Sequence, residues 1–345
     1  MTGPCIEEPP NRLRLIGNAR VRRTVKRRDW LRLAGSAAVG LGELARRPIS
    51  AIGADDPKSQ AGESAEQEIR RADAIVRRAT DQEVRKFHSA HYQALGDASE
   101  TFIKLTLADC EQVALDYLKH YRDKGFDVRP PERRLILIVF ADERPFLKYA
   151  GRVPPGLAGF YSQRTNWLAL FDFRNTPMMT VAAGQDNRET VTHEATHQLN
   201  FNTGILERSG DAPHWISEGL AMYGERRKLR GPSEPGQINQ RRLIELAHSR
   251  RRVDWIPVAN LVAEKPNWYG GSPAQRTLGY AESWLLVYHL MTDPVRLPQL
   301  RAYLKTLRTR KDQLHRLDDA RSHFGDLELL DQELRQVSVR LLRAP

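Results

Sequence analysis

The segment His193-Glu194-Ala195-Thr196-His197 constrains this chain more than any other feature. Residues four apart lie on one face of an α-helix, about 6 Å from each other, so both imidazoles can reach a single metal ion. Glu194 lies about 100° round the helix from His193, where it can flank an ion without ligating it, as a general base does. Asp186 and Glu189 have the spacing of a capping box and predict the start of this helix, and Gly204 predicts its end.

A third ligand is needed, because residue frequencies alone produce such a segment in a chain of this length on the order of 1% of the time. The metzincin pattern fails, since Asn200 and Thr203 occupy the positions of its glycine and third histidine. A carboxylate from a following helix is the alternative. Pro213 predicts the start of that helix, and Glu218 on it completes two histidines and one glutamate, a set that leaves a fourth position open.

The pattern His193-Glu194-x-x-His197-Gln198 followed by Trp215-x-x-Glu218-Gly219-x-Ala221 resembles the gluzincin metallopeptidases, in particular the aminopeptidase-like branch and its small secreted relatives of unassigned substrate. The resemblance extends over residues 134–290. It implies a thermolysin-like fold, zinc as the metal, Glu194 as the base and Glu218 as the third ligand. It also implies that a tyrosine on a later helix stabilises the oxyanion. Tyr280 matches that position and His214 is the second candidate, while a core or helix-surface role for Tyr280 is the alternative.

Two departures from the family pattern limit what can be carried over. The Gly-x-Met-Glu-Asn motif that holds a substrate's free amine is absent, which disfavours aminopeptidase activity. Met222 replaces the aspartate expected four residues after the third ligand, so a different residue must orient the histidines. Glu225 lies on the same helix face as Glu218 and is a candidate, although a solvated surface role is the favoured interpretation.

Hydrophobic patterning predicts an α+β fold in which a small sheet comes first and helices carry the site. Helices are expected over residues 65–85 and 97–121, and strands over 87–95, 134–140 and 167–171, with Asp142 as a helix cap. The strand at 167–171 precedes the site helix, where the gluzincins have the edge strand that lines the substrate; a simple sheet strand is the alternative. Cys110 is expected to be a buried small hydrophobe.

The net charge of +11 is concentrated at the N-terminus. Residues 1–50 hold 11 Lys and Arg against four Asp and Glu, so the rest of the chain carries only +4, which disfavours nucleic-acid binding. A second basic cluster, at residues 226–230, 241–242 and 250–252, is interpreted as a solvated helix face. No apolar run is long enough for a permanent membrane span.

The N-terminus is predicted to be an export signal. Lys26, Arg27 and Arg28 precede a weakly apolar stretch, Leu33 to Leu44, and small residues follow at 50–54. The paired arginines resemble a twin-arginine signal, whose export machinery would be a transient partner. The expected organisation is this signal at 1–54, a flexible joint at 55–63, a helix and strand region at 64–130 and a zinc metallopeptidase domain at 131–345.

The sequence therefore predicts an exported, periplasmic or extracellular zinc peptidase, endopeptidase-like, acting on a peptide or protein substrate. Zinc and Glu194 would together activate the attacking water. The alternative is a zinc-holding, non-catalytic binding protein of the cell envelope, against which the intact base argues.

Overall fold

The computed structural model of this chain describes residues 62–151, 153, 157–175, 183–225 and 235–343. Within these residues the protein has a mixed α+β fold, with one five-stranded sheet and a larger helical part. The predicted export signal, nearly all of the predicted joint and the basic residues 226–230 lie outside the described residues. None of the described helices is both long enough and apolar enough to cross a membrane.

The sheet has the strand order β1-β2-β3-β5-β4. Its two inner pairings, β2 with β3 and β3 with β5, are parallel, whereas the outer strands β1 and β4 pair antiparallel with their neighbours. The strands are β1 (Arg85–His88), β2 (Tyr92–Gly96), β3 (Leu135–Phe140), β4 (Gly159–Ser162) and β5 (Trp167–Phe171). One sheet thus contains strands from both sides of the predicted boundary at residue 130.

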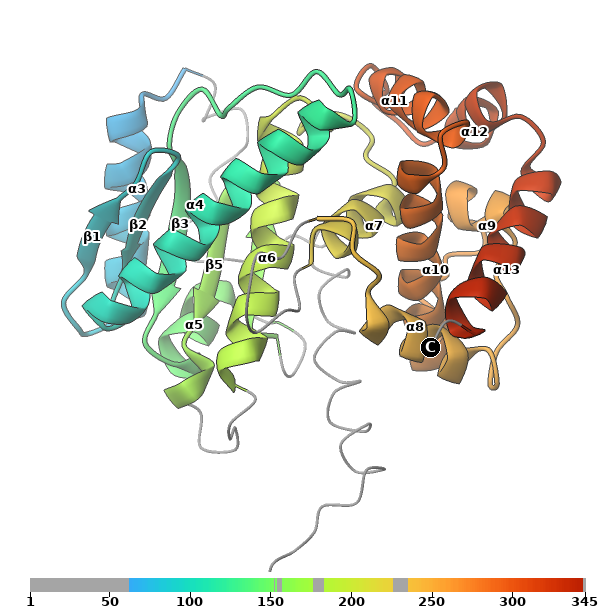
Figure 1. The fold of residues 1–345 in the computed structure, drawn as a ribbon. Coiled ribbons are helices and arrows are strands. Elements are labelled where there is room, and N and C mark those ends of the chain that lie inside the picture. The colour runs from blue at the N-terminus through green and yellow to red at the C-terminus, as the bar shows by residue number, and fades with distance from the viewer. Residues whose placement is uncertain (1–61, 152, 154–156, 176–182, 226–234, 344–345) are drawn as a thin grey trace, which may run out of the picture.

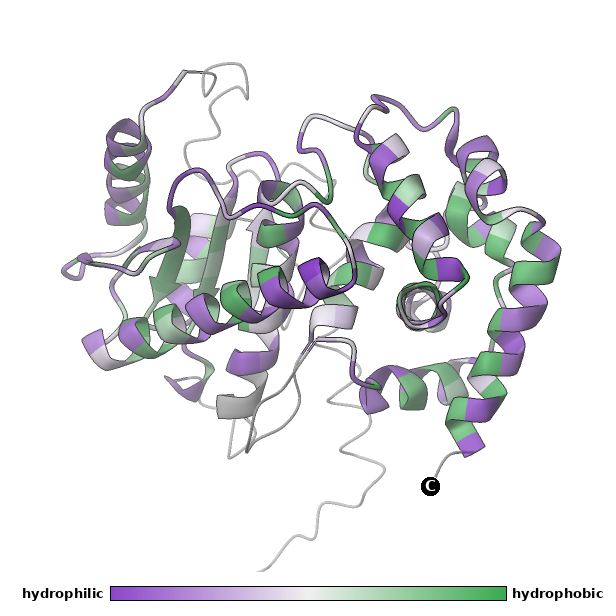
Figure 2. Cartoon of the chain, turned by 45° about the horizontal axis from the view of Figure 1, so that its top comes forward, coloured by the Kyte–Doolittle hydropathy of each residue, from purple (hydrophilic) through white to green (hydrophobic). Residues whose placement is uncertain are grey.

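The central strand β3 is apolar throughout because helices cover both faces of the sheet. Leu135, Leu137 and Val139 belong to a core cluster shared with α4 (Glu100–Asp123) and α6 (Ala183–Asn202). The alternate residues of β3 face a second cluster, shared with α3 (Ala65–Ala79) and α5 (Glu143–Ala150). In Figure 2 the strands are coloured largely as hydrophobic, and the helices around them carry both hydrophilic and hydrophobic residues.

The helical part is built around α10, against which α7, α8, α11 and α13 pack. The helix α7 also packs on α6, and so it joins the sheet layer to the helical part (Figure 1). The helices are α7 (His214–Gly224), α8 (Gln240–Ser249), α9 (Val258–Ala263), α10 (Pro273–Thr292), α11 (Arg296–Leu307), α12 (Arg316–Phe324) and α13 (Leu327–Arg343).

Most predicted elements are confirmed, including the helix cap at Asp142 and the burial of Cys110. The strand expected at 87–95 is a hairpin of two strands, β1 and β2. The expectation of an edge strand at 167–171 is wrong, because β5 lies between β3 and β4. The edge next to the site helix is β4, a short strand within a Gly- and Pro-rich segment whose composition hides it.

Candidate metal centre

The helix α6 presents His193 and His197 on one face. Their Nε2 atoms are 3.2 Å apart and both side chains are buried. The helix begins at Ala183, so Asp186 lies inside it and the capping box predicted at its start is wrong. Gly204 follows the end of the helix with a φ of +96°, as expected for a terminating glycine.

Two glycines of α7 allow this helix to lie close against α10 on one side and α6 on the other. A Cβ at Gly219 would lie 2.6 Å from the carbonyl oxygen of Ser283 on α10. A Cβ at Gly224 would lie 2.5 Å from Oγ1 of Thr196, which stands between the two histidines on α6. This double contact brings Glu218, in the middle of α7, opposite the histidine face of α6.

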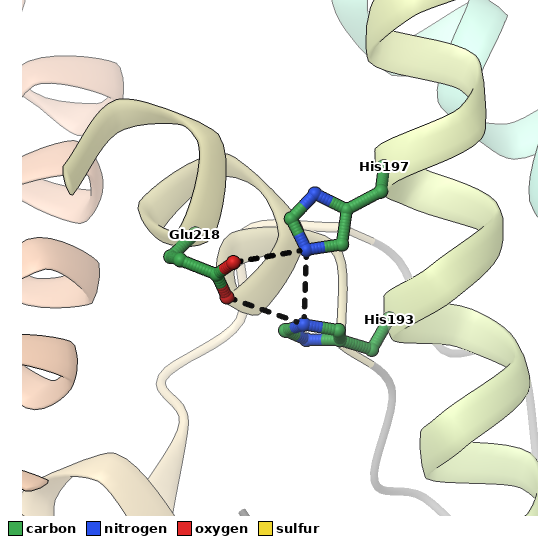
Figure 3. A group of neighbouring side chains, drawn as sticks. All are labelled: His193, His197 and Glu218. Carbon is green, nitrogen blue, oxygen red and sulfur yellow. Dashed lines mark hydrogen bonds and ion pairs between the residues drawn. The ribbon is translucent and has the colours of Figure 1, made fainter. Parts of the chain in front are cut away.

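Glu218 and the two histidines form a triangle that fits one metal ion (Figure 3). One carboxylate oxygen of Glu218 lies 3.5 Å from Nε2 of His193, and the other lies 3.5 Å from Nε2 of His197. A tetrahedral ion with ligand bonds near 2.0–2.2 Å places its ligand atoms about 3.3 Å apart. The three separations between the candidate ligand atoms, 3.2, 3.5 and 3.5 Å, therefore match the edges of such a site.

The carboxylate of Glu218 is the clearest sign that a cation belongs there. It is fully buried, and within the described part of the chain neither of its oxygens accepts a hydrogen bond. Burial acts to raise the pKa of Glu218, but the charge of His197 and the adjacent ring of His193 outweigh it, and the pKa lies well below its ordinary value. A buried, ionised carboxylate without hydrogen-bond donors requires a positive charge close by.

Glu225 orients His193, so the surface role favoured from the sequence is wrong. Its side chain is only 7% exposed, and Oε1 lies 2.9 Å from Nδ1 of His193. Because a carboxylate accepts, Nδ1 carries the proton and Nε2 is left to face the ion. Burial acts to lower the pKa of His193, yet the carboxylates of Glu218 and Glu225 outweigh it and raise this pKa to about 10.

Glu225 is itself held by two residues near the start of α8. Arg242 donates from Nη2 to Oε1 of Glu225 at 2.7 Å, and Asn239 donates from Nδ2 to Oε2 at 2.6 Å. Burial acts to raise the pKa of Glu225, but the charge of Arg242 and the bond to His193 keep it well below its usual range. Arg242 is 3% exposed and also pairs with Glu245, so this member of the second basic cluster is not on a solvated face.

Glu194 lies beside the ligands and contacts the edge strand. Its Oε2 accepts a 2.7 Å hydrogen bond from the backbone N–H of Tyr161 on β4. The Tyr161 ring is stacked on His197, with centroids 6.5 Å apart. Burial raises the pKa of Glu194 above its ordinary value, although the charges of the two histidines oppose this.

Tyr280 and His214 form a buried pair between α10 and the start of α7. The hydroxyl of Tyr280, on α10, lies 3.0 Å from Nε2 of His214, the first residue of α7, and both side chains are buried. The charge of His214 contributes to the low pKa of Glu218, which places His214 near the carboxylate. The structure thus brings all six residues singled out in the sequence into one region.

Three groups that contact the candidate metal centre were not predicted from the sequence. The backbone N–H of Tyr161 and the side chain of Asn239 carry no sequence signal, since the folded chain alone brings them to the site. Ser217, whose Oγ lies 3.4 Å from Nδ1 of His197, could have been suspected from its place beside Glu218.

The family described as "Protein of unknown function (DUF1570)" matches residues 187–312 of this chain. The matched segment runs from within α6 past the end of α11 and contains the three ligand candidates, Glu194, His214 and Tyr280. A comparison with curated proteins found no match. The family description states no activity.

Proposed function

We propose that this chain is an exported zinc-dependent peptidase that cleaves peptide bonds by hydrolysis, with Glu194 as the general base. The observation that carries the proposal is the buried triangle of His193, His197 and Glu218 with a second carboxylate beside it. Two imidazoles and one carboxylate are the ligand set of catalytic zinc sites, which keep one position open. The resemblance to the gluzincin pattern points to the same chemistry.

A zinc ion held there would act as a Lewis acid toward water and toward a substrate carbonyl. Glu194 takes a proton from the attacking water as its oxygen adds to the carbonyl carbon. When the C–N bond breaks, Glu194 returns that proton to the leaving nitrogen, which departs as an amine. The raised pKa of Glu194 suits a group that must first accept a proton and then donate it.

Tyr280 and His214 are proposed to stabilise the negative charge that develops on the carbonyl oxygen. Their side chains meet at 3.0 Å, so they form one donor pair rather than two separate groups. Both are buried, and a hydrogen bond to a developing oxyanion is stronger in a site that excludes water.

The first experiment measures zinc per chain in the purified wild type and in Glu218→Ala. One zinc per chain in the wild type and none in Glu218→Ala are expected, because two histidines alone hold the ion weakly. A wild type that takes up no zinc, from the cell or after incubation with it, would overturn the proposal. A Glu218→Ala protein that keeps its zinc would overturn the ligand assignment.

Hydrolysis is tested with casein and a peptide library, with and without a chelator. Chelator-sensitive cleavage is expected, and Glu194→Gln should retain zinc and lose turnover by about 10²–10⁴-fold. Full turnover in Glu194→Gln would refute its role as the base. A wild type that holds zinc and cleaves nothing would instead favour the zinc-holding envelope protein.

Export through the twin-arginine route is proposed from Arg27 and Arg28 before the apolar stretch. The mature protein is expected to begin near residue 55. Replacing both arginines by lysine should keep the chain in the cytoplasm, and an exported protein that still begins at Met1 would contradict the proposal.

A further inference from the structure

The helix α7, which carries Glu218, has no side-chain cap of its own. Its N-cap residue is Pro213, whose side chain offers no hydrogen-bond acceptor. The first N–H groups of a helix have no partners within the helix, and leaving them unpaired is costly when they are buried. His214 and Trp215, the first two residues of α7, are 2% and 0% exposed.

Glu264 supplies the missing cap from a distant part of the chain. Its Oε1 accepts hydrogen bonds from the backbone N–H of His214 and from that of Trp215, the latter at 3.2 Å. A negative charge at this end of a helix is also favoured by the helix dipole. The carboxylate, itself buried, thus holds the first turn of α7.

The backbone conformation at Glu264 is unfavourable for a glutamate, which indicates that the contacts of its side chain account for this residue. Glu264 is the C-cap residue of α9 and has a left-handed conformation, with φ of 54° and ψ of 37°. Glycine or asparagine is usual there, and another residue costs about 1–2 kcal/mol of backbone strain. The contacts of the carboxylate offset this cost.

Arg316, on α12, ties this cap to the segment that leads into α7. Its Nη1 donates to Oε2 of Glu264, and its Nε and Nη2 donate to the two carboxylate oxygens of Asp211 at 2.6 and 2.5 Å. Arg316 is 3% exposed. Glu264 and Asp211, joined through Arg316, thus hold the chain on both sides of Pro213.

We propose that Glu264 is a positioning residue of the metal centre. By capping α7, Glu264 fixes the position of this helix. That position determines how Glu218, one turn further along, faces the histidines and how His214 contacts Tyr280. The two oxygens of Glu218 accept no hydrogen bond within the described residues, so the position of α7 decides where they point. The inference rests on the proposed metal site and does not depend on peptidase activity.

The test compares zinc affinity in the wild type and in Glu264→Gly, by titration of the full mature chain against a chromophoric chelator. Glycine relieves the left-handed backbone, so the variant loses the cap without added strain. Zinc affinity is expected to fall by at least about tenfold. This is the smallest loss typical of removing a residue that orients a metal ligand.

Asp293→Ala is the matched control. The Oδ1 atom of Asp293 also accepts from two backbone N–H groups at the start of a helix, those of Val295 at 2.8 Å and of Arg296, the first residue of α11, at 3.1 Å. This variant should bind zinc within about twofold of the wild type, even where its Tm falls as much as that of Glu264→Gly. A general loss of stability would lower zinc affinity in both variants alike.

A second readout needs no metal. In chelator-treated wild type, the amides of His214 and Trp215 should exchange hydrogen slowly, and in Glu264→Gly they should exchange fast. Unchanged zinc affinity in Glu264→Gly, or fast exchange of both amides in the wild type, would overturn the inference. If Glu264→Gly does not fold, Glu264→Met, which keeps the length of the side chain but has no oxygen to accept from the two N–H groups, is measured in its place and judged by the same criteria. A wild type that binds no zinc defeats the proposed function, whereas hydrogen exchange still decides whether Glu264 caps α7.

Discussion

Replacing Glu225 by glutamine should weaken zinc binding although Glu225 does not touch the ion. Its Oε1 lies 2.9 Å from Nδ1 of His193 and 2.7 Å from Nη2 of Arg242, and its Oε2 lies 2.6 Å from Nδ2 of Asn239. All three neighbours donate. Whichever way the glutamine amide turns, its NH₂ group meets a donor where the carboxylate offered an acceptor.

The size of the effect follows from the bonds that are lost. Hydrogen bonds to a charged group contribute about 1.5–3 kcal/mol each to stability. Loss of a residue that orients a metal ligand costs about 10–100-fold in metal affinity, which corresponds to about 1.4–2.8 kcal/mol of binding free energy. Competition against a chromophoric chelator at fixed pH measures the affinity, and thermal unfolding measures the stability separately.

Glu245→Gln is the control within the same network. Glu245 accepts from Arg242 at 2.8 Å and from Arg241 at 2.9 Å, but it contacts no metal-ligand candidate. It should lower the Tm and leave zinc affinity within about twofold, because Arg242 keeps its own bond to Glu225. Wild-type zinc affinity in Glu225→Gln, or an equal loss in Glu245→Gln, would refute the orienting role.

Three further outcomes are expected. Tyr280→Phe should keep its zinc and lose about 10–10³-fold in kcat, because one oxyanion donor is removed; unchanged kcat in a peptide assay would remove Tyr280 from the site. Gly219→Ala should lower the free energy of unfolding by about 1–3 kcal/mol, because the new Cβ would meet the Ser283 carbonyl oxygen at 2.6 Å; a denaturation curve that matches the wild type would contradict the close packing of α7 on α10. In chelator-treated protein, the stability that His193 contributes is complete below its unfolded pKa of about 6.5 and is lost as the pH rises toward its folded pKa of about 10. Saturating zinc should reverse this trend, because the metal and the proton compete for the same nitrogen; thermal unfolding from pH 6 to 10 distinguishes the two slopes.

The local parts of the site could be read from the sequence. His193 and His197 share a helix face because 3.6 residues make a turn, and that relation holds wherever the helix packs. His214 lies four residues before Glu218 in the sequence, whereas Tyr280 was chosen because the family resemblance implies a tyrosine on a later helix. Strand β3 was predictable for a similar reason, since six consecutive apolar residues suit a strand covered on both faces.

Burial and pairing between distant segments depended on the tertiary structure. The sequence favoured a surface role for Glu225 and a solvated face for Arg242, because charged residues are usually exposed. The salt bridge between Arg242, near the start of α8, and Glu225, just after the end of α7, makes both wrong by giving each charge a buried partner. Strand β4 is the sheet edge beside Glu194 because it pairs with β5. The mixed composition of its four residues does not predict this pairing.

The metal-ligand candidates and the cap of α7 also differ in whether the sequence or the tertiary structure made them evident. The side chains that can ligate a metal were evident from the sequence, because ligand chemistry and helical spacing are properties of short segments. The residues that orient these ligands became evident from the folded structure. Glu225 reaches His193 across 32 positions of the chain, and Glu264 reaches the start of α7 across 50. Contacts of that span depend on how whole helices pack, and no local pattern encodes them.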